Sequence, residues 1–155
     1  MFTLSGRSQK VYDTLHKDLK LVIDEALKYS QVDFTLIEGA RTTARQQMLF
    51  NKGKSKVNPE KYSAYELISK GKHIVNNHRL ESWAFDFIAS VPGKPELIYD
   101  KYHLLYLIGV FTSVGKRLFA EGKISHDIRS GANWDMDGEL KYDQGFFDAP
   151  HIELI

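Results

Sequence analysis

The stretch Trp83-Ala84-Phe85-Asp86-Phe87-Ile88-Ala89 alternates side chains between two faces and carries one carboxylate in its middle. Alternation with aromatic and β-branched residues predicts a strand, and the apolar content of this run is typical of a central one. A strand holds its side chains rigidly, so Asp86 is a candidate for a fixed chemical role. We therefore take this strand as the centre of the fold.

The segments on either side predict helices and further strands. Apolar residues at helical spacing predict one long helix over 11–27, with Ser8 as its N-cap, and a second over 102–121. Shorter helices are expected at 43–51 and within 62–68, the latter in a polar loop. Further strands are expected where the sequence is rich in β-forming residues, at 32–37, 124–128 and 151–155. The pattern indicates one α+β domain over 1–155, with a small, mostly antiparallel sheet and two main helices packed on it.

Composition narrows the classes of function. The 155 residues carry a net charge of +1, so no nucleic-acid partner is expected. The absence of cysteine excludes thiolate catalysis and cysteine-bound zinc, which leaves His, Asp and Glu as metal ligands. The chain has no run of about 20 apolar residues and no signal-peptide pattern at its N-terminus, so we expect no membrane insertion and a cytoplasmic location.

Three residues at or near predicted strands form a candidate metal set. His73, Asp86 and His151 supply nitrogen and oxygen ligands that suit zinc, whose catalytic sites use three protein ligands and keep a fourth position open. Such a set can be chosen from many sequences, so residue type alone is weak support. His16 and His103 fall on predicted helices and are expected to be surface or packing residues.

Local motifs support this set more strongly, because they resemble those of the zinc DD-peptidases and occur in that family's order. They cover nearly the whole chain: Glu38-Gly39-Ala40-Arg41-Thr42, Ser69-Lys70-Gly71-Lys72-His73, Trp83-Ala84-Phe85-Asp86, Gly131-Ala132-Asn133-Trp134-Asp135 and Asp148-Ala149-Pro150-His151. The nearest resemblance is to single-domain L-alanyl-D-glutamate peptidases that serve as bacteriophage endolysins, which are relatives of the VanY-type D-alanyl-D-alanine carboxypeptidases.

The resemblance implies a role for each matching residue. His73, Asp86 and His151 would bind Zn²⁺ on the sheet, and Asp148 would be the catalytic base. Arg41 would be catalytic as well, contacting the developing oxyanion or a substrate carboxylate. Further substrate contacts are expected from three residues: Gln46, His78 and Trp134.

The sequence departs from the family pattern in two places. An insert, 76–82, separates His73 from Asp86 and contains His78, which lies one residue away from the family's usual spacing to Asp86. We prefer His73 as the ligand because of its lead-in sequence and treat His78 as a loop residue. Ser82 stands near a position where the family often has glycine.

The expected function is hydrolysis of the L-alanyl-D-glutamate bond in the peptidoglycan stem peptide by a monomeric endolysin. It would wait in the cytoplasm of the host bacterium until lysis and then act on the cell wall. A D-alanyl-D-alanine carboxypeptidase and a non-catalytic wall-binding module are the alternatives. The acidic loop 135–139 also resembles part of a calcium loop, so Ca²⁺ is a further candidate ligand.

Overall fold

The structure is a computed structural model that describes the backbone of residues 1–140 and 148–155 and the side chains of residues 1–140 and 150–155. The α-helices are α1 (Gly6–Asp13), α2 (Lys17–Tyr29), α3 (Thr43–Asn51), α4 (Ala64–Lys70) and α5 (Lys101–Ala120). Two short 3₁₀ helices are η1 (Pro59–Lys61) and η2 (Pro95–Leu97). The strands are β1 (Asp33–Glu38), β2 (Ala84–Ser90), β3 (Ile128–Gly131) and β4 (Asp148–Leu154). Across the described residues, no helix combines the length and apolar character needed to cross a membrane.

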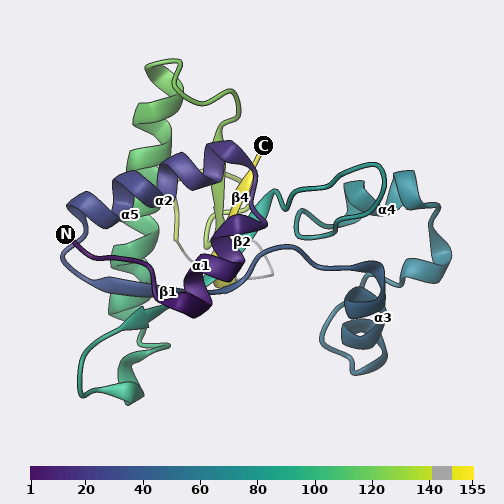
Figure 1. Cartoon of the computed structure of the whole chain (residues 1–155), viewed down its shortest axis with the longest axis horizontal. Coiled ribbons are helices and arrows are strands. Elements are labelled where there is room, and N and C mark those ends of the chain that lie inside the picture. Colours follow the sequence, from purple (N-terminus) through teal and green to yellow (C-terminus); the bar gives the residue numbers. More distant parts are fainter. Residues whose placement is uncertain (141–147) are drawn as a thin grey trace.

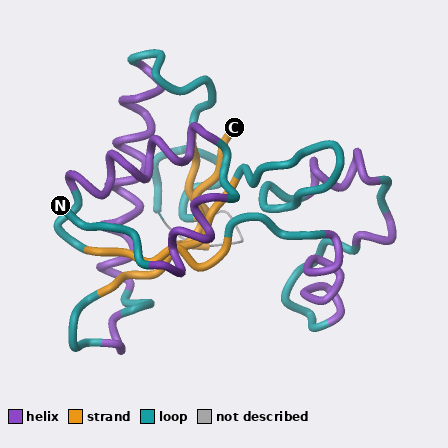
Figure 2. Tube along the Cα trace, in the orientation of Figure 1, coloured by secondary structure: helices purple, strands orange, loops and turns teal. Residues whose placement is uncertain are grey.

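The strands form one antiparallel sheet in the order β1-β2-β4-β3, with α2 and α5 as the two main helices beside it (Figure 1). The short strands meet at the centre of the molecule, as the tube in Figure 2 shows. The α+β class with a small antiparallel sheet is confirmed. The central strand expected at 83–89 is confirmed with bounds one residue later, as β2 (Ala84–Ser90), which pairs with β1 on one side and with β4 on the other.

One face of the sheet packs against the helices and forms the core. Phe85 and Phe87 of β2 are fully buried, and their rings contact that of Phe111 on α5 at centroid distances of 5.2 and 4.9 Å. Ile152 and Leu154 of β4 are also fully buried. Because side chains alternate along a strand, Asp86 and His151 are left on the opposite face of the sheet.

The polar residues of that opposite face are aligned by strand register. Asp86 pairs with His151 across β2 and β4, and Glu153 pairs with Arg129 across β4 and β3. Pro150 cannot donate to a ladder, and it falls where the β3–β4 register shifts, between the Ser130 and Gly131 pairings. The register thus gathers charged side chains on one surface.

The expected single N-terminal helix is two helices. Ser5 caps α1, and the chain leaves the helix after Thr14. The reason lies in tertiary pairing: Ser82 donates its N–H to the carbonyl of Thr14 at 2.9 Å, and its own carbonyl accepts the N–H of His16 at 2.9 Å. Ser8 is buried inside α1 rather than capping it, and its hydroxyl accepts the N–H of Leu36 in β1.

The strand expected at 124–128 begins only at Ile128. The preceding N–H groups of Ser125 and His126 donate to the Oδ2 atom of Asp18 on α2, at 2.9 and 3.1 Å, instead of to a neighbouring strand. The His126 ring nitrogen Nδ1 lies 2.8 Å from the same oxygen. Asp18 is 1% exposed, so this buried carboxylate fixes the path of the chain into β3.

We expect Asp18→Asn to lower the free energy of unfolding by about 1–3 kcal/mol at neutral pH, because buried hydrogen bonds to a charged acceptor are weakened. Burial opposes ionisation, but the bonds from His126 and Ser125 outweigh it and lower the pKa of Asp18. A depressed folded-state pKa stabilises the fold above the unfolded-state pKa and loses that effect as the pH falls through the folded-state pKa. In urea titrations, the difference in the free energy of unfolding between wild type and variant should therefore become smaller below about pH 4. A difference that is constant with pH would contradict this role, and the exposed Asp13→Asn is the control.

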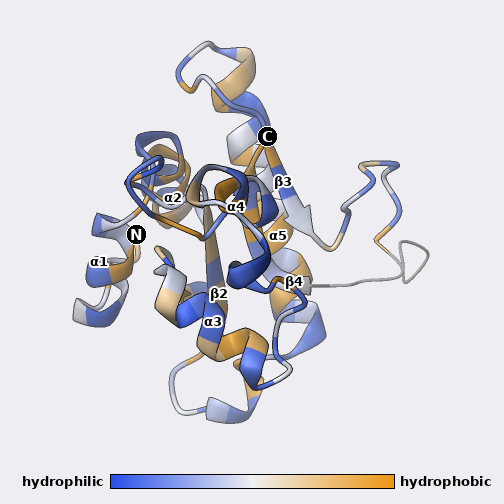
Figure 3. Ribbon diagram, turned by 90° about the vertical axis from the view of Figure 1, so that its right-hand side faces the viewer, coloured by the Kyte–Doolittle hydropathy of each residue, from blue (hydrophilic) through white to orange (hydrophobic). Residues whose placement is uncertain are grey.

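Residues 41–72 form an outer lobe that extends away from the helix-covered core (Figure 1). The lobe contains α3, η1 and α4, and Figure 3 views it from its own side, with α3 and α4 in front of the strands. Helix α3 has the predicted bounds and is capped by Thr42, and α4 begins with a capping box between Ser63 and Glu66. The lobe is therefore ordered by local capping, and it stands opposite the polar face of the sheet.

Candidate metal centre

His73, Asp86 and His151 converge at the polar face of the sheet. The Nε2 atom of His73 lies 3.2 Å from Oδ1 of Asp86 and 3.2 Å from Nδ1 of His151, and the last two atoms are 3.0 Å apart. Asp86 and His151 are neighbours through strand register. His73 comes from a turn rather than from the expected strand edge, and the following residue, Ile74, is fixed by a bridge to Arg41.

The spacing of these atoms fits a tetrahedral metal ion. Ligands at zinc distances of 2.0–2.1 Å would lie about 3.3 Å from one another in that geometry. All three distances are close to that value, so His73, Asp86 and His151 form a group that could hold a metal ion. Two nitrogens and one oxygen are also a donor set that suits zinc.

Hydrogen bonds at the outer nitrogens orient both imidazole rings. The Nδ1 atom of His73 lies 2.8 Å from the carbonyl oxygen of Gly39, and Nε2 of His151 lies 2.9 Å from Oε2 of Glu153. These acceptors bind the outer nitrogen of each ring, so the other nitrogen is directed at the cluster. Both rings are thus held in the orientation that a metal ligand needs.

Glu153 is a functional candidate that the sequence analysis missed. It is 5% exposed, and its second oxygen accepts a hydrogen bond from Arg129. The signal was present in the alternation of the terminal strand, which places Glu153 on the same face as His151. Glu153 contacts the outer nitrogen of His151 and not the three atoms that face the metal position. We therefore assign it as a positioning residue.

The charges of the cluster affect one another strongly. Burial disfavours the charged form of Asp86, but His73 and His151 outweigh it and hold the pKa of Asp86 well below its usual range. Burial would lower the pKa of His151, but the hydrogen bonds that its ring donates to Asp86 and Glu153 outweigh burial and raise that pKa to about 9. The site therefore favours positive charge between its carboxylates, which a divalent cation supplies.

We expect Glu153→Gln to weaken zinc binding by about 10- to 100-fold, the usual cost of losing an outer partner of a metal-bound histidine. Competition with a chromophoric chelator would measure this affinity. Glu60→Gln, in the exposed η1, is the matched control and should bind zinc like the wild type. Unchanged affinity in Glu153→Gln would rule out the positioning role.

The cluster lies in a cleft of about 910 Å³ between the outer lobe and the polar face of the sheet. The lobe side of the lining is Arg41, Gln46, Leu49, Gly53, Lys54, Ser55, Lys56, Val57, Ser69, Lys70, Gly71 and Lys72. The sheet side contains Asp86 of β2, Arg129 of β3, Trp134 after the end of β3, and His151 and Glu153 of β4. His73 also lines the cleft. The volume is sufficient for a short peptide segment.

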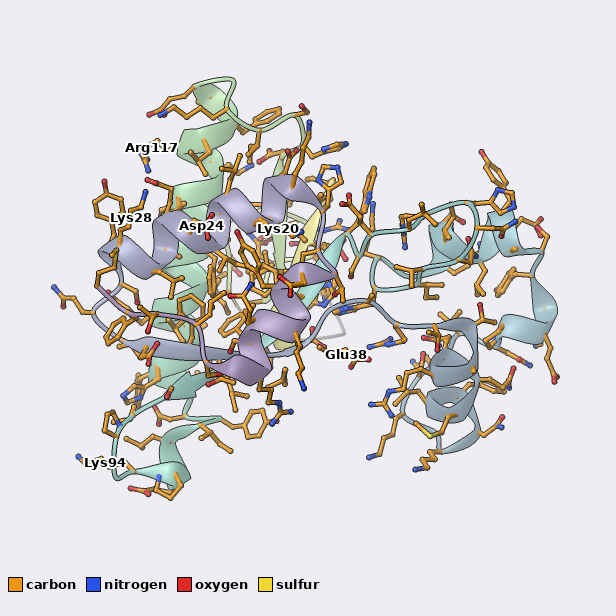
Figure 4. All side chains as sticks on the ribbon, viewed as in Figure 1. Lys20, Asp24, Lys28, Glu38, Lys94 and Arg117 are labelled. Carbon is orange, nitrogen blue, oxygen red and sulfur yellow. The ribbon has the colours of Figure 1, made fainter. Side chains whose placement is uncertain are left out.

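Arg41 and Gln46 hold each other at the lobe side of the cleft. The guanidinium of Arg41 donates from Nε to Glu38 at 2.9 Å and from Nη1 to the side-chain oxygen of Gln46 at 3.1 Å. Gln46 is 1% exposed and donates to the Ser55 hydroxyl and the Val57 carbonyl, both at 2.8 Å. Figure 4 labels Glu38 where the chain leaves β1 for the lobe. Gln46 therefore positions both Arg41 and the 55–57 loop.

The other expected substrate contacts have different surroundings. Trp134 lines the cleft, and its ring lies 5.1 Å from that of His151. His78 is exposed on the insert, where its ring contacts that of Tyr65 at 5.6 Å, and it is not among the residues that line the cleft. Of the two histidines weighed as the first ligand, the structure brings only His73 to Asp86.

Two further expectations concern the acidic residues near the C-terminus. The backbone of Asp148 starts β4 and pairs with Gly131, while its side chain lies outside the described residues. In the acidic loop, Asp135 and Asp137 accept N–H groups of residues 137 and 139. These bonds close the turn, and among the described residues the loop does not form a metal-competent group, so calcium is unsupported.

A second His/Asp group lies at the start of α2. His16, Asp18 and His126 are close enough to hold an ion, but Nδ1 of His16 is 3.9 Å from the Asp18 carboxylate and accepts the N–H of Asp18 as a helix cap. Asp18 already accepts three bonds from Ser125 and His126. These hydrogen bonds account for the closeness of His16, Asp18 and His126, so we assign the group a structural role. The cluster of His73, Asp86 and His151 differs because it lies in a cleft.

The fold and the site together define an α+β protein with a His–Asp–His group, able to hold a metal, at the floor of a cleft. The chain belongs to the phage L-alanyl-D-glutamate peptidase family, whose model matches residues 1–155. It is 27% identical over 157 residues to the L-alanyl-D-glutamate peptidase of Escherichia phage T5, covering 99% of this chain and 98% of that relative.

A solved structure supports the same fold. The crystal structure of the Serratia marcescens L-Ala D-Glu endopeptidase ChiX matches with a TM-score of 0.63 and 21% sequence identity, covering 98% of this chain and 89% of that one. The expected family, the α+β fold and the peptidase class are confirmed. The metal and the individual residue roles stay predictions.

Proposed function

We propose that this chain is a zinc-dependent endolysin that hydrolyses the L-alanyl-D-glutamate bond of the peptidoglycan stem peptide. The observation that carries the proposal is the convergence of His73, Asp86 and His151, with mutual distances of 3.0–3.2 Å, at the floor of an open cleft. Membership of the phage L-alanyl-D-glutamate peptidases supports the choice of bond.

His73, Asp86 and His151 would hold the zinc ion. When bound, zinc lowers the pKa of a water molecule to about 7 and polarises a carbonyl group. Three protein ligands are the number that catalytic zinc sites use, because they leave a position for water or substrate. The buried, hydrogen-bonded rings of the two histidines support this role, since they are held in one orientation before the ion arrives.

Asp148 is our candidate for the general base. It would accept a proton from the attacking water and deliver it to the leaving amine of the D-glutamyl residue, so that the C–N bond breaks with no net change in protons. Its place at the start of β4, three residues before His151, supports this assignment. On the β3 side of β4, the register shift falls between the Ile152 and Asp148 pairings.

Arg41 would stabilise the negative charge that develops on the carbonyl oxygen, or hold a substrate carboxylate. Its bonds to Glu38 and Gln46 fix the guanidinium plane, which reduces the entropy lost when substrate binds. Among the described residues these bonds use Nε and Nη1, so Nη2 is available to a substrate oxygen.

The relatives' substrate implies action on the cell wall. Synthesis in the host cytoplasm before lysis and a monomeric state belong to the same proposal.

Digestion of purified peptidoglycan, with and without a chelator, tests the proposal. Mass spectrometry should find new N-terminal D-glutamate only without chelator. Release of D-alanine instead would favour a carboxypeptidase, and no chelator-sensitive product would favour a binding module. Either result would overturn the proposed reaction.

A further inference from the structure

The cleft is far more cationic than the chain as a whole. The chain has a net charge of +1, with 21 basic and 20 acidic residues. Among the described residues that line the cleft, the carboxylates are Asp86 and Glu153. The basic residues are Arg41, Lys54, Lys56, Lys70, Lys72 and Arg129. This excess of positive charge favours an anionic ligand.

Most of these basic side chains already have hydrogen-bond partners or are exposed to solvent. Arg129 donates to Glu153 and to the carbonyl of Trp134, and Arg41 donates to Glu38 and Gln46. The three lysines at the lobe surface are exposed: Lys54, Lys56 and Lys70. None of these needs a ligand to compensate its charge.

Lys72 differs from them. It is half-buried next to His73, its carbonyl accepts the N–H of Trp83 at 2.8 Å, and its ammonium lies 5.2 Å from the centre of the Trp83 ring. It makes no salt bridge with any described side chain. A partly desolvated ammonium over an aromatic face is stabilised by an anion that completes its coordination.

The neighbouring side chains do not form a salt bridge with Lys72. Arg79 is itself a cation and donates to the carbonyls of Gly71 and Ile74, and Arg129 donates to Glu153. Lys72 therefore has no salt-bridge partner among the described side chains, and it is one of the residues that line the cleft.

We propose that Lys72 binds the free α-carboxylate of the D-glutamyl residue next to the scissile bond, which makes it a specificity-determining residue. This inference rests on the proposed function. The stem peptide continues through the side-chain carboxyl of D-glutamate, so the α-carboxylate lies one carbon from the scissile nitrogen. Lys72 directly precedes the proposed ligand His73 and lines the same cleft, whereas Arg41 is held by Glu38 at the end of β1.

A matched pair of synthetic stem peptides tests the inference. One carries the free α-carboxylate of D-glutamate and the other its α-amide, and kcat/KM is measured for both. Wild type should prefer the free acid by about 10- to 100-fold, the worth of a hydrogen bond to a charged group. Lys72→Met should remove most of that preference, chiefly through KM, and Lys72→Arg should keep part of it.

Lys20→Met is the control, because Lys20 also lies over an aromatic ring, that of Tyr12 at 5.5 Å, but on α2 and outside the cleft (Figure 4). It should keep the wild-type preference. Equal cleavage of both peptides by wild type, or an unchanged preference in Lys72→Met, would overturn the inference while leaving the proposed function standing. If wild type cleaves neither peptide, the proposed function itself fails. Lys72→Gln gives an independent reading if the methionine variant does not fold.

Discussion

His151→Ala is expected to lose both bound zinc and hydrolysis. We propose His151 as a ligand that is positioned from two sides, because β4 aligns it with Asp86 and Glu153 holds its outer nitrogen at 2.9 Å. Removal of a direct ligand should cost more than the about 10- to 100-fold in affinity that loss of an outer partner costs. Zinc content after dialysis and release of peptide from peptidoglycan measure the two effects.

His78→Ala is the matched control for that variant. It removes an imidazole from the same chain, but from an exposed turn outside the cleft. It should retain zinc and most of the activity. The reverse result, with zinc lost in His78→Ala and kept in His151→Ala, would show that the ligand set is wrong.

Asp148→Asn is expected to keep zinc and to lose hydrolysis by about 10²- to 10⁴-fold, the usual contribution of a general base. The amide has nearly the same shape as the carboxylate, but it cannot accept a proton. Because His73, Asp86 and His151 remain, zinc should bind as in wild type. The effect should fall on kcat rather than on zinc affinity.

Asp86→Asn provides the contrast to this variant. It makes the same chemical change at a residue that we assign to the metal, so it should lose zinc together with activity. Near-normal hydrolysis by Asp148→Asn would remove Asp148 from the mechanism. Equal loss of zinc in both variants would mean that Asp148 acts as a ligand.

The strength of the local patterns explains what the sequence could predict. The alternation around Asp86 gives β2 and its buried face, because Phe85 and Phe87 pack on α5. The bounds of α3 follow from its cap at Thr42. The lead-in sequence favoured His73 over His78, and the structure brings His73 to the cluster.

Long-range hydrogen bonds explain what local patterns could not predict. The break between α1 and α2 depends on Ser82, which is distant in sequence and pairs with Thr14 and His16. The late start of β3 depends on Asp18, more than 100 residues earlier in the chain. The role of Glu153 became visible only once Arg129 and His151 were placed on either side of it.

Ion pairs on the far side of the molecule have a separate, structural role. Glu25 of α2 contacts Arg117 of α5 at 2.9 Å and Lys28 at 2.5 Å, and Figure 4 shows these basic residues where the two helices meet. Exposed pairs of this kind contribute little to stability. The Glu25–Arg117 pair joins the two helices that cover one sheet face, whereas the Glu25–Lys28 pair lies within α2.

Zinc titration of the metal-free protein tests the central claim most directly. Hydrolysis of a peptide containing the L-alanyl-D-glutamate bond is followed as zinc is added. The predicted result is activity that rises in proportion to bound zinc and saturates at one ion per chain, with no such rise in His151→Ala. Full hydrolysis by the metal-free protein, or zinc that binds at this cluster without restoring hydrolysis, would contradict the claim.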